Sequence, residues 1–147
     1  MNNFINPQLT KQVIIGTKSQ SRRKLFKMMN LKFQYRSANI NEKAVKNLKN
    51  DKYDALKIAK AKATYLSKKN KNKIIITFDT TILHMGQTIY KCHTKMCCKN
   101  ILKSFNNTSH NLYTGMVFMI NNSLIRSSLT KTKVVFKKNK IMDVNKY

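Results

Sequence analysis

The sequence predicts an α/β domain in which a mixed central β-sheet is flanked by helices, and three observations lead to this fold class. Residues 54–69 carry apolar side chains at helical spacing. Residues 74–78 form an apolar run, Ile-Ile-Ile-Thr-Phe, that is typical of a buried central strand. Residues 112–120 and 123–136 predict two long strands joined at an Asn-Asn turn.

The N-terminal part of the chain predicts a strand, a polar loop and a helix, in that order. Residues 12–15 are rich in β-branched side chains, and Gly16 ends the run. Apolar residues at helical spacing then predict a helix over 22–30, with Ser19 or Ser21 as its N-cap. Such a layout suits an anion, because backbone N–H groups and the positive end of the helix dipole point toward the loop.

Two adjacent arginines, Arg22 and Arg23, stand at the start of this helix. Their guanidinium groups add forked donors for phosphate oxygens. The loop lacks the glycines of a P-loop or a dinucleotide fingerprint, so neither of those motifs applies.

The other predicted elements complete the sheet and its connections. They are a strand at 33–36, a polar loop and short helix within 39–50, a turn at 70–73, a hairpin of 80–83 with 88–90, a helix from Thr94 to about residue 105, a turn at 106–110, and the beginning of a helix at 137–147.

Asp79 is the most informative acidic residue in the sequence. It is one of only five acids, and it directly follows the most hydrophobic predicted strand. A carboxylate at the end of a central strand, beside a phosphate-attracting loop, commonly holds a divalent cation or acts on water. The simpler alternative is an aspartate that caps a turn or pairs with a lysine.

The charge has two interpretations. The 147 residues include 30 Lys and Arg against 5 Asp and Glu, a formal net charge of +25. This charge is typical of a nucleic-acid-binding protein. However, the basic residues are 26 Lys and only 4 Arg, spread along the whole chain among 18 Asn and 14 Ile. Drift in an A/T-rich genome explains that composition better, because nucleic-acid interfaces use Arg heavily.

The length predicts one domain over residues 1–147, and the expected location is the cytoplasm. No apolar stretch is long enough to cross a membrane, and the N-terminus lacks the apolar core of a secretory signal. The three cysteines, Cys92, Cys97 and Cys98, are predicted to be reduced thiols on or near a helix, because a zinc site would need a second set of ligands.

The ordered motifs resemble the Maf family of nucleoside triphosphate pyrophosphatases. The matching motifs are the strand and Ser-containing loop with its double arginine at 13–25, Asn41-Glu42, Ala61-Lys62-Ala63, the strand 74–79 ending in Asp79, Tyr90-Lys91-Cys92, and Tyr113-Thr114-Gly115. Gly16 and one residue inserted before the double arginine are most similar to the 7-methyl-GTP pyrophosphatase branch.

The resemblance implies a fold related to inosine triphosphate pyrophosphatases and hydrolysis of a nucleoside triphosphate to the monophosphate and pyrophosphate, with Mg²⁺ or Mn²⁺. By the same resemblance, Asp79 is the proton acceptor, and Glu42 and Asp79 are the metal ligands. Ser21 and Thr80 influence the choice of base. The residues implied for phosphate binding are Ser19, Arg22, Arg23, Lys62 and Lys91.

The sequence also departs from the family pattern. Asn41 and Ala61 replace acids, Gln20 replaces a proline, and the Gly-Lys-Pro motif keeps only Lys91. The family continues for about a further quarter of its length, so we expect an unpaired sheet edge that a homodimer would cover. A catalytically impaired nucleotide-binding remnant is therefore the alternative to an active enzyme, and a nucleic-acid-binding protein is the less favoured one.

Overall fold

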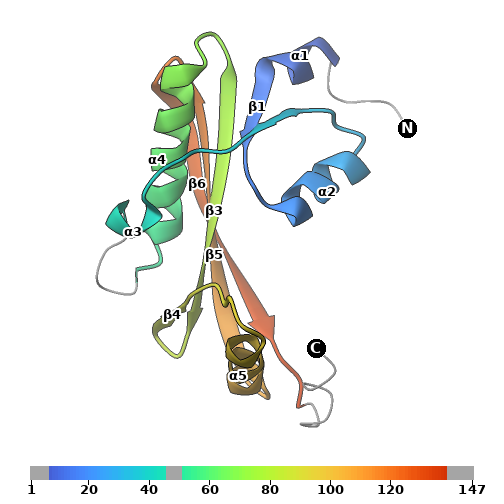
Figure 1. Cartoon of the computed structure of the whole chain (residues 1–147), viewed down its shortest axis with the longest axis vertical. Helices are drawn as coiled ribbons and strands as arrows, with labels where there is room; N and C mark the ends of the chain where they lie inside the picture. The colour runs from blue at the N-terminus through green and yellow to red at the C-terminus, as the bar shows by residue number, and fades with distance from the viewer. Residues whose placement is uncertain (1–6, 46–50, 139–147) are drawn as a thin grey trace.

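The described residues, 7–45 and 51–138 of the computed structural model, form one mixed sheet with helices on both faces (Figure 1). Six strands follow the order β2-β1-β3-β5-β6, with β4 paired to the far end of β3. β1 is parallel to β2 and to β3, whereas β5 is antiparallel to its two neighbours, β3 and β6, and β4 is antiparallel to β3. This architecture confirms the predicted fold class.

The elements follow the predicted order with two exceptions: α1 was not predicted, and the strand predicted at 80–83 is a continuation of β3. They are α1 (Pro7–Gln12), β1 (Val13–Gly16), α2 (Gln20–Met28), β2 (Gln34–Arg36), α3 (Glu42–Val45), α4 (Asp54–Lys69), β3 (Ile74–His84), β4 (Gln87–Ile89), α5 (Lys95–Phe105), β5 (Ser109–Ile120) and β6 (Ser123–Val135). β5 begins inside the turn predicted at 106–110, because Ser109 already pairs with Val135 of β6. All but the first two residues of the helix predicted at 137–147 lie outside the described residues.

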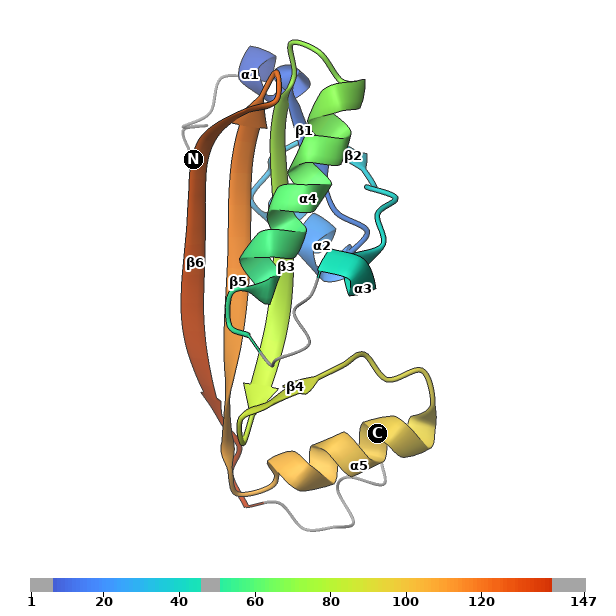
Figure 2. The ribbon, with the colours of Figure 1, turned by 90° about the vertical axis from the view of Figure 1, so that its left-hand side faces the viewer.

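The hydrophobic core lies between α4 and one face of the sheet, while α2 lies on the other face (Figures 1 and 2). Its buried cluster consists of Ile14, Ala59, Ala63, Leu66, Ile75, Val117 and Met119. The hydroxyl of Thr77, fully buried in β3, donates a 2.6 Å hydrogen bond to the Ala59 carbonyl of α4. These contacts fix the position of α4 along β3.

β3 does not end at Asp79, as the sequence predicted, but continues to His84. The reason is its ladder with β5, which runs without interruption from Ile74 to Leu83. On the other side, β1 accompanies β3 only as far as Thr77. Among the described residues, β3 therefore has an open edge at Asp79 until β4 begins to pair with it at Ile82.

Gly115 allows α4 to approach β5 by backbone contact. It lies directly opposite Asp79 in the β3–β5 ladder. A Cβ atom at this position would be 2.6 Å from both the Cα and the N atom of Leu56, in the first turn of α4. The glycine of the Tyr-Thr-Gly motif thus has a packing explanation, and the close approach keeps α4 next to the Asp79 segment.

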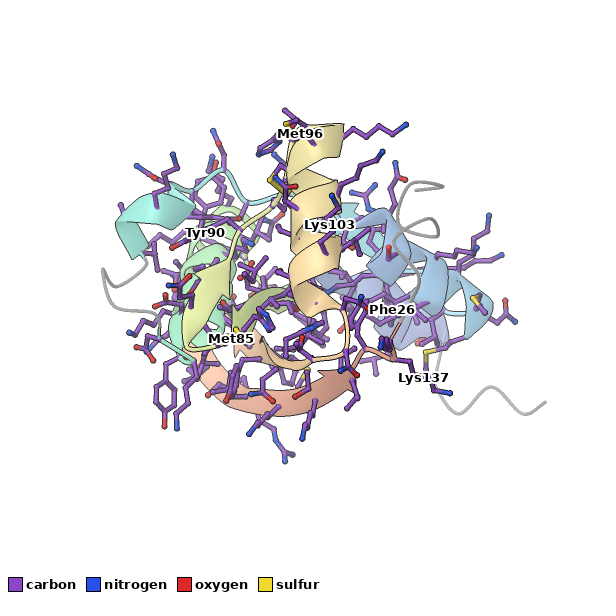
Figure 3. All side chains as sticks on the ribbon, turned by 90° about the horizontal axis from the view of Figure 1, so that it is seen from below. Phe26, Met85, Tyr90, Met96, Lys103 and Lys137 are labelled. Atoms are coloured by element: carbon purple, nitrogen blue, oxygen red, sulfur yellow. A yellow bond between two sulfur atoms is a disulfide. The ribbon has the colours of Figure 1, made fainter. Side chains whose placement is uncertain are left out.

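The lower end of the molecule is built around α5, which crosses beneath the far end of β3 and β5 (Figure 2). Thr94 caps α5 as predicted, with its hydroxyl accepting a 3.2 Å hydrogen bond from the Cys97 N–H. At the other end of the helix, Phe105 stacks on His110 at a centroid distance of 4.2 Å. Met96 is 75% exposed on the outer turns of α5 (Figure 3).

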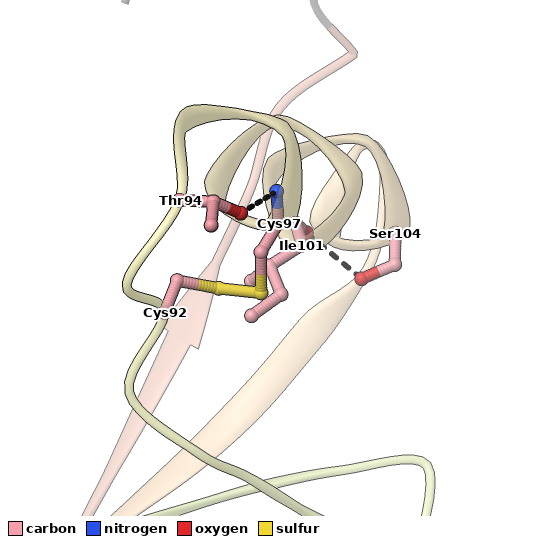
Figure 4. Close-up of a disulfide and its surroundings, with 5 residues drawn as sticks. All are labelled: Cys92, Thr94, Cys97, Ile101 and Ser104. Atoms are coloured by element: carbon pink, nitrogen blue, oxygen red, sulfur yellow. Dashed lines mark hydrogen bonds between the residues drawn. A yellow bond between two sulfur atoms is a disulfide. The ribbon is translucent and has the colours of Figure 1, made fainter.

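The prediction of three reduced cysteines is wrong in this structure, because Cys92 and Cys97 form a disulfide (Figure 4). The Thr94 cap turns the chain so that the two Cα atoms lie 5.6 Å apart, within the usual range for a disulfide. Cys98 is the free, exposed cysteine. Among the described residues, no group of three or more His, Cys, Asp or Glu side chains is placed to hold a metal ion.

We expect native protein purified without reductant to contain one thiol that reacts with Ellman's reagent, since only Cys98 is free. Denaturation after reduction should reveal three thiols, and Cys98→Ser should remove the native signal. Three reactive thiols in the native, unreduced protein would contradict the disulfide.

β6 forms one edge of the sheet. It pairs with β5, and within the described ranges no strand pairs with its other side. Ile125 and Val135 on this strand are 53% and 68% exposed. The expectation of an unpaired, partly apolar edge therefore holds for the part of the chain that the structure describes. No helix in that part is both long and apolar enough to cross a membrane.

Candidate functional site

A lysine held between two carboxylates forms the centre of the site. The Lys62 ammonium of α4 lies 2.7 Å from Asp79 Oδ1 of β3 and 2.8 Å from Glu42 Oε1 of α3. The side chains of Lys62 and Asp79 are 15% and 16% exposed, whereas that of Glu42 is 48% exposed. Three residues far apart in the sequence thus meet at the open edge of β3, and Asp79 pairs with a lysine as the simpler alternative had proposed.

Asn41 orients the segment that carries Glu42. Its side-chain oxygen accepts a 3.4 Å hydrogen bond from the Ala44 N–H, in the manner of a helix N-cap. Glu42 is the first residue of α3, a favourable position for a carboxylate because of the helix dipole. The uncharged residue at 41 therefore has a structural role.

Burial raises the pKa of the Asp79 carboxyl group above its usual value of 3.8, because desolvation penalises the charged form. The hydrogen bond and the positive charge of Lys62 oppose this increase, as does Arg22, while the negative charge of Glu42 adds to it. A carboxylate with a raised pKa accepts a proton more readily than an exposed one.

We expect the Asp79 carboxyl carbon to titrate above pH 3.8 in an NMR titration of the folded protein. Because its pKa is higher in the folded than in the unfolded state, this group favours folding at acidic pH. That contribution is lost as the pH rises through the folded pKa. Glu42→Gln should lower the midpoint by removing a negative neighbour, and a midpoint that does not move would contradict the coupling.

Arg22 stands beside the carboxylates, on the α2 side of β3. Ser19 caps α2, and its hydroxyl accepts a 3.3 Å hydrogen bond from the Arg22 N–H. The Arg22 guanidinium donates a 2.8 Å hydrogen bond to the Thr80 hydroxyl and lies 5.5 Å from the centre of the Phe78 ring. Burial lowers the pKa of Arg22, and the negative charge of Asp79 opposes this.

The alternation of side chains along β3 explains this arrangement. Asp79 points toward α4, whereas Thr80 points toward α2. The Lys62 cluster and the Arg22 group therefore come from opposite faces of the sheet. They approach each other beyond Thr77, where the pairing of β1 with β3 has ended.

The structure separates the other predicted site residues from this cluster. Arg23 donates a 2.9 Å hydrogen bond to the Thr17 carbonyl and lies over the Tyr35 ring of β2. Ser21 is exposed in the first turn of α2. Lys91 is exposed between β4 and α5, and it forms no ion pair with a carboxylate of the described residues.

Two residues at the site were not assigned a role from the sequence: Phe78 and Thr114. Thr114 hydrogen-bonds Thr80 across the β3–β5 ladder, with 3.1 Å between the hydroxyl oxygens. This pair can be predicted only if the register between β3 and β5 is known, and local sequence patterns do not define that register.

The carboxylates fit one kind of divalent cation site. Asp79 and Glu42 supply two hard oxygen donors brought together by Lys62, which suits Mg²⁺ or Mn²⁺ that takes its remaining ligands from phosphate and water. The described residues do not form an all-protein cage.

Comparison with known proteins identifies the family. The family model described as "Maf-like protein" matches residues 12–147. This chain belongs to the Maf family. The Lys62, Asp79 and Arg22 cluster lies entirely within the matched region.

Curated relatives match most of the chain. A dTTP/UTP pyrophosphatase of Lacticaseibacillus casei is 27% identical over 92% of the chain and 72% of its own length. A nucleoside triphosphate pyrophosphatase of Pelagibacter ubique is 25% identical, with 95% and 74% covered. A dTTP/UTP pyrophosphatase of Thermosipho melanesiensis is 31% identical over 86% of the chain and 66% of the relative.

A solved structure, the Ham1 protein of Staphylococcus aureus, overlaps the Maf chain with a TM-score of 0.49 and 13% identity. The match covers 84% of this chain and 70% of the Ham1 chain.

Proposed function

We propose that this chain hydrolyses nucleoside triphosphates to the monophosphate and pyrophosphate. The observation that carries the proposal is the Lys62 ammonium held between Asp79 and Glu42, next to the Arg22 guanidinium. The names of the curated relatives support the same reaction class.

In this mechanism, Asp79 accepts a proton from the water that attacks the α-phosphorus. Oxygen from water bonds to phosphorus, the bond to the bridging oxygen breaks, and pyrophosphate leaves. The raised pKa of Asp79 makes its carboxylate a better acceptor, while Lys62 fixes the direction in which it points.

Arg22 and Lys62 provide positive charge where the triphosphate is proposed to lie. Arg22 has a restricted guanidinium, because Thr80 and Phe78 both contact it, so little side-chain entropy is lost on phosphate binding. Ser19 caps the helix that carries Arg22 and so orients its backbone. A bound Mg²⁺ or Mn²⁺ would neutralise phosphate charge, and Asp79 and Glu42 are the residues that would hold it.

Lys91 requires a separate argument, because it is exposed and lies beyond β4. We propose that it contributes to phosphate attraction through the segment that joins β4 and α5. The net charge of +25 supports the attraction of a triphosphate in general, since a strongly positive surface raises the local concentration of anions.

Two base preferences have support. Several relatives are named for dTTP and UTP, which makes these pyrimidine nucleotides the first candidates. The loop around Gly16, with the residue inserted before Arg22, is similar to the 7-methyl-GTP branch and makes that nucleotide the second candidate. Thr80 is the proposed selector, because its side chain lies between Arg22 and Thr114.

A turnover assay with dTTP, UTP, GTP and 7-methyl-GTP tests this function. Pyrophosphate release should require Mg²⁺ or Mn²⁺ and stop when EDTA is added. Equal amounts of pyrophosphate and monophosphate would support cleavage between the α- and β-phosphates, whereas release of inorganic phosphate alone would contradict it.

Nucleotide binding measured by calorimetry separates the enzyme from the impaired remnant. Micromolar binding of a nucleotide with no turnover would indicate a remnant that retains the phosphate site. Absence of both binding and turnover for all four nucleotides would overturn the proposed function.

A further inference from the structure

We propose that Thr114 is a positioning residue for the phosphate site, which acts through Thr80 on Arg22; this inference rests on the proposed function. The three side chains form a continuous chain of hydrogen bonds. Arg22 Nη2 donates to Thr80 Oγ1 over 2.8 Å, and Thr80 Oγ1 lies 3.1 Å from Thr114 Oγ1.

The sheet register makes this arrangement rigid. Thr80 and Thr114 are direct partners in the antiparallel β3–β5 ladder, so their side chains point to the same face. Asp79 and Gly115 are the next partners along the same ladder. Because these two pairs are consecutive in one ladder, Thr114 has a fixed position relative to Asp79, whose carboxylate is proposed to accept the proton.

Among the described residues, Thr80 pairs with a neighbouring strand on one side only, that of β5. On its other side β1 has ended at Gly16, opposite Thr77, and β4 has not yet begun at Ile82. A threonine hydroxyl has one donor and two acceptor lone pairs. Thr80 can therefore accept from Arg22 and still exchange a second hydrogen bond with Thr114, which holds its hydroxyl in one rotamer.

The Thr114 hydroxyl should affect nucleotide binding more than the chemical step. Within the described residues, the Thr114 hydroxyl is not hydrogen-bonded to Asp79 or Lys62, and it is linked to Arg22 through Thr80. Loss of its hydroxyl should release the Thr80 side chain and loosen the Arg22 guanidinium. The intact Tyr113-Thr114-Gly115 motif then has two separate functions, with Gly115 packing against α4 and Thr114 ordering the phosphate ligand.

Thr114→Val tests the proposal, because valine keeps the shape of threonine and removes the hydroxyl. We expect the Kd for a non-hydrolysable α,β-methylene triphosphate to increase by about threefold to tenfold, the range of one neutral hydrogen bond. KM should rise by a similar factor and kcat should change by less than twofold. Thr114→Ser should restore the parent values.

Thr130→Val is the matched control. Thr130 pairs with Thr114 on the same rung of the sheet but belongs to β6, one strand further from Arg22. The Thr130→Val variant should bind the nucleotide with the same Kd as the parent. In a Thr80→Val background, Thr114→Val should have no further effect. Additive losses, or a Thr114→Val variant that binds like the parent, would overturn the proposal.

A measurement without nucleotide keeps the two proposals distinguishable. The sequence contains only four arginines, so their Nε–H signals can be assigned individually by NMR. The ¹⁵N heteronuclear NOE of Arg22 should fall in Thr114→Val and remain unchanged in Thr130→Val. An unchanged Arg22 NOE in Thr114→Val overturns the positioning role of Thr114. If the parent binds no nucleotide but the Arg22 NOE still falls in Thr114→Val, the positioning role stands and only the proposed function is overturned.

Discussion

Asp79→Asn should lower kcat by about 10²- to 10⁴-fold, the usual contribution of a positioned general base. Asparagine has the size of aspartate and can still accept the hydrogen bond from Lys62, but it cannot take a proton from water. The variant should therefore bind the triphosphate and fail to hydrolyse it. Single-turnover measurements with saturating nucleotide would separate these two steps.

The same variant should not be unstable. The pKa of Asp79 is raised by burial, so the charged form is disfavoured in the folded protein, and its removal at pH 7 should leave the Tm equal to or above that of the parent. Asp51→Asn is the matched control, because this variant also removes one negative charge near α4. The parent Asp51 side chain pairs with Lys57, outside the site. The Asp51→Asn variant should retain kcat within twofold. Equal activity of Asp79→Asn and the parent would disprove the role of Asp79.

Gly115→Ala should lower the free energy of unfolding by about 2–3 kcal/mol, the cost of overpacking a tight contact, with a decrease in Tm of about 10 °C. The added Cβ would lie 2.6 Å from the backbone of Leu56, so α4 must move away from β5. That movement should also weaken the contact between Lys62 and Asp79. Thermal unfolding and nucleotide turnover measured below the Tm would detect both effects.

Gly16→Ala provides a graded comparison. An added Cβ at this position would meet the ends of the Thr77 and Leu66 side chains rather than a backbone, at 2.6 Å and 2.7 Å. Side chains can adjust more easily than a helix backbone, so Gly16→Ala should be less destabilising than Gly115→Ala. A loss of less than 0.5 kcal/mol in Gly115→Ala would contradict the proposed close packing.

The sequence predicted the elements well wherever local pattern determines structure. The spacing of apolar residues in α4 and the Ser19 and Thr94 caps are local features, and each appears as expected. The end of β3 could not be predicted in this way. Its continuation beyond Asp79 depends on hydrogen bonds to β5, a strand that begins 30 residues later in the sequence.

The site was only partly predictable for the same reason. A resemblance to a family pointed to Asp79, Lys62 and Glu42, and the structure brings these three together. It did not predict the hydrogen bond between Thr80 and Thr114, which depends on strand register. Nor did the sequence predict the disulfide, because three closely spaced cysteines do not reveal whether two of them face each other.

The ion pairs of α4 have a consequence for the surface as a whole. The described acids, Glu42, Asp51, Asp54 and Asp79, all pair with one of two lysines on that helix, Lys57 or Lys62. Almost all the fixed negative charge is thus gathered along a single helix, while the basic residues are distributed over the whole chain. Away from α4 the molecule behaves as a polycation, whose repulsion is balanced by mobile anions from the solvent instead of by its own side chains.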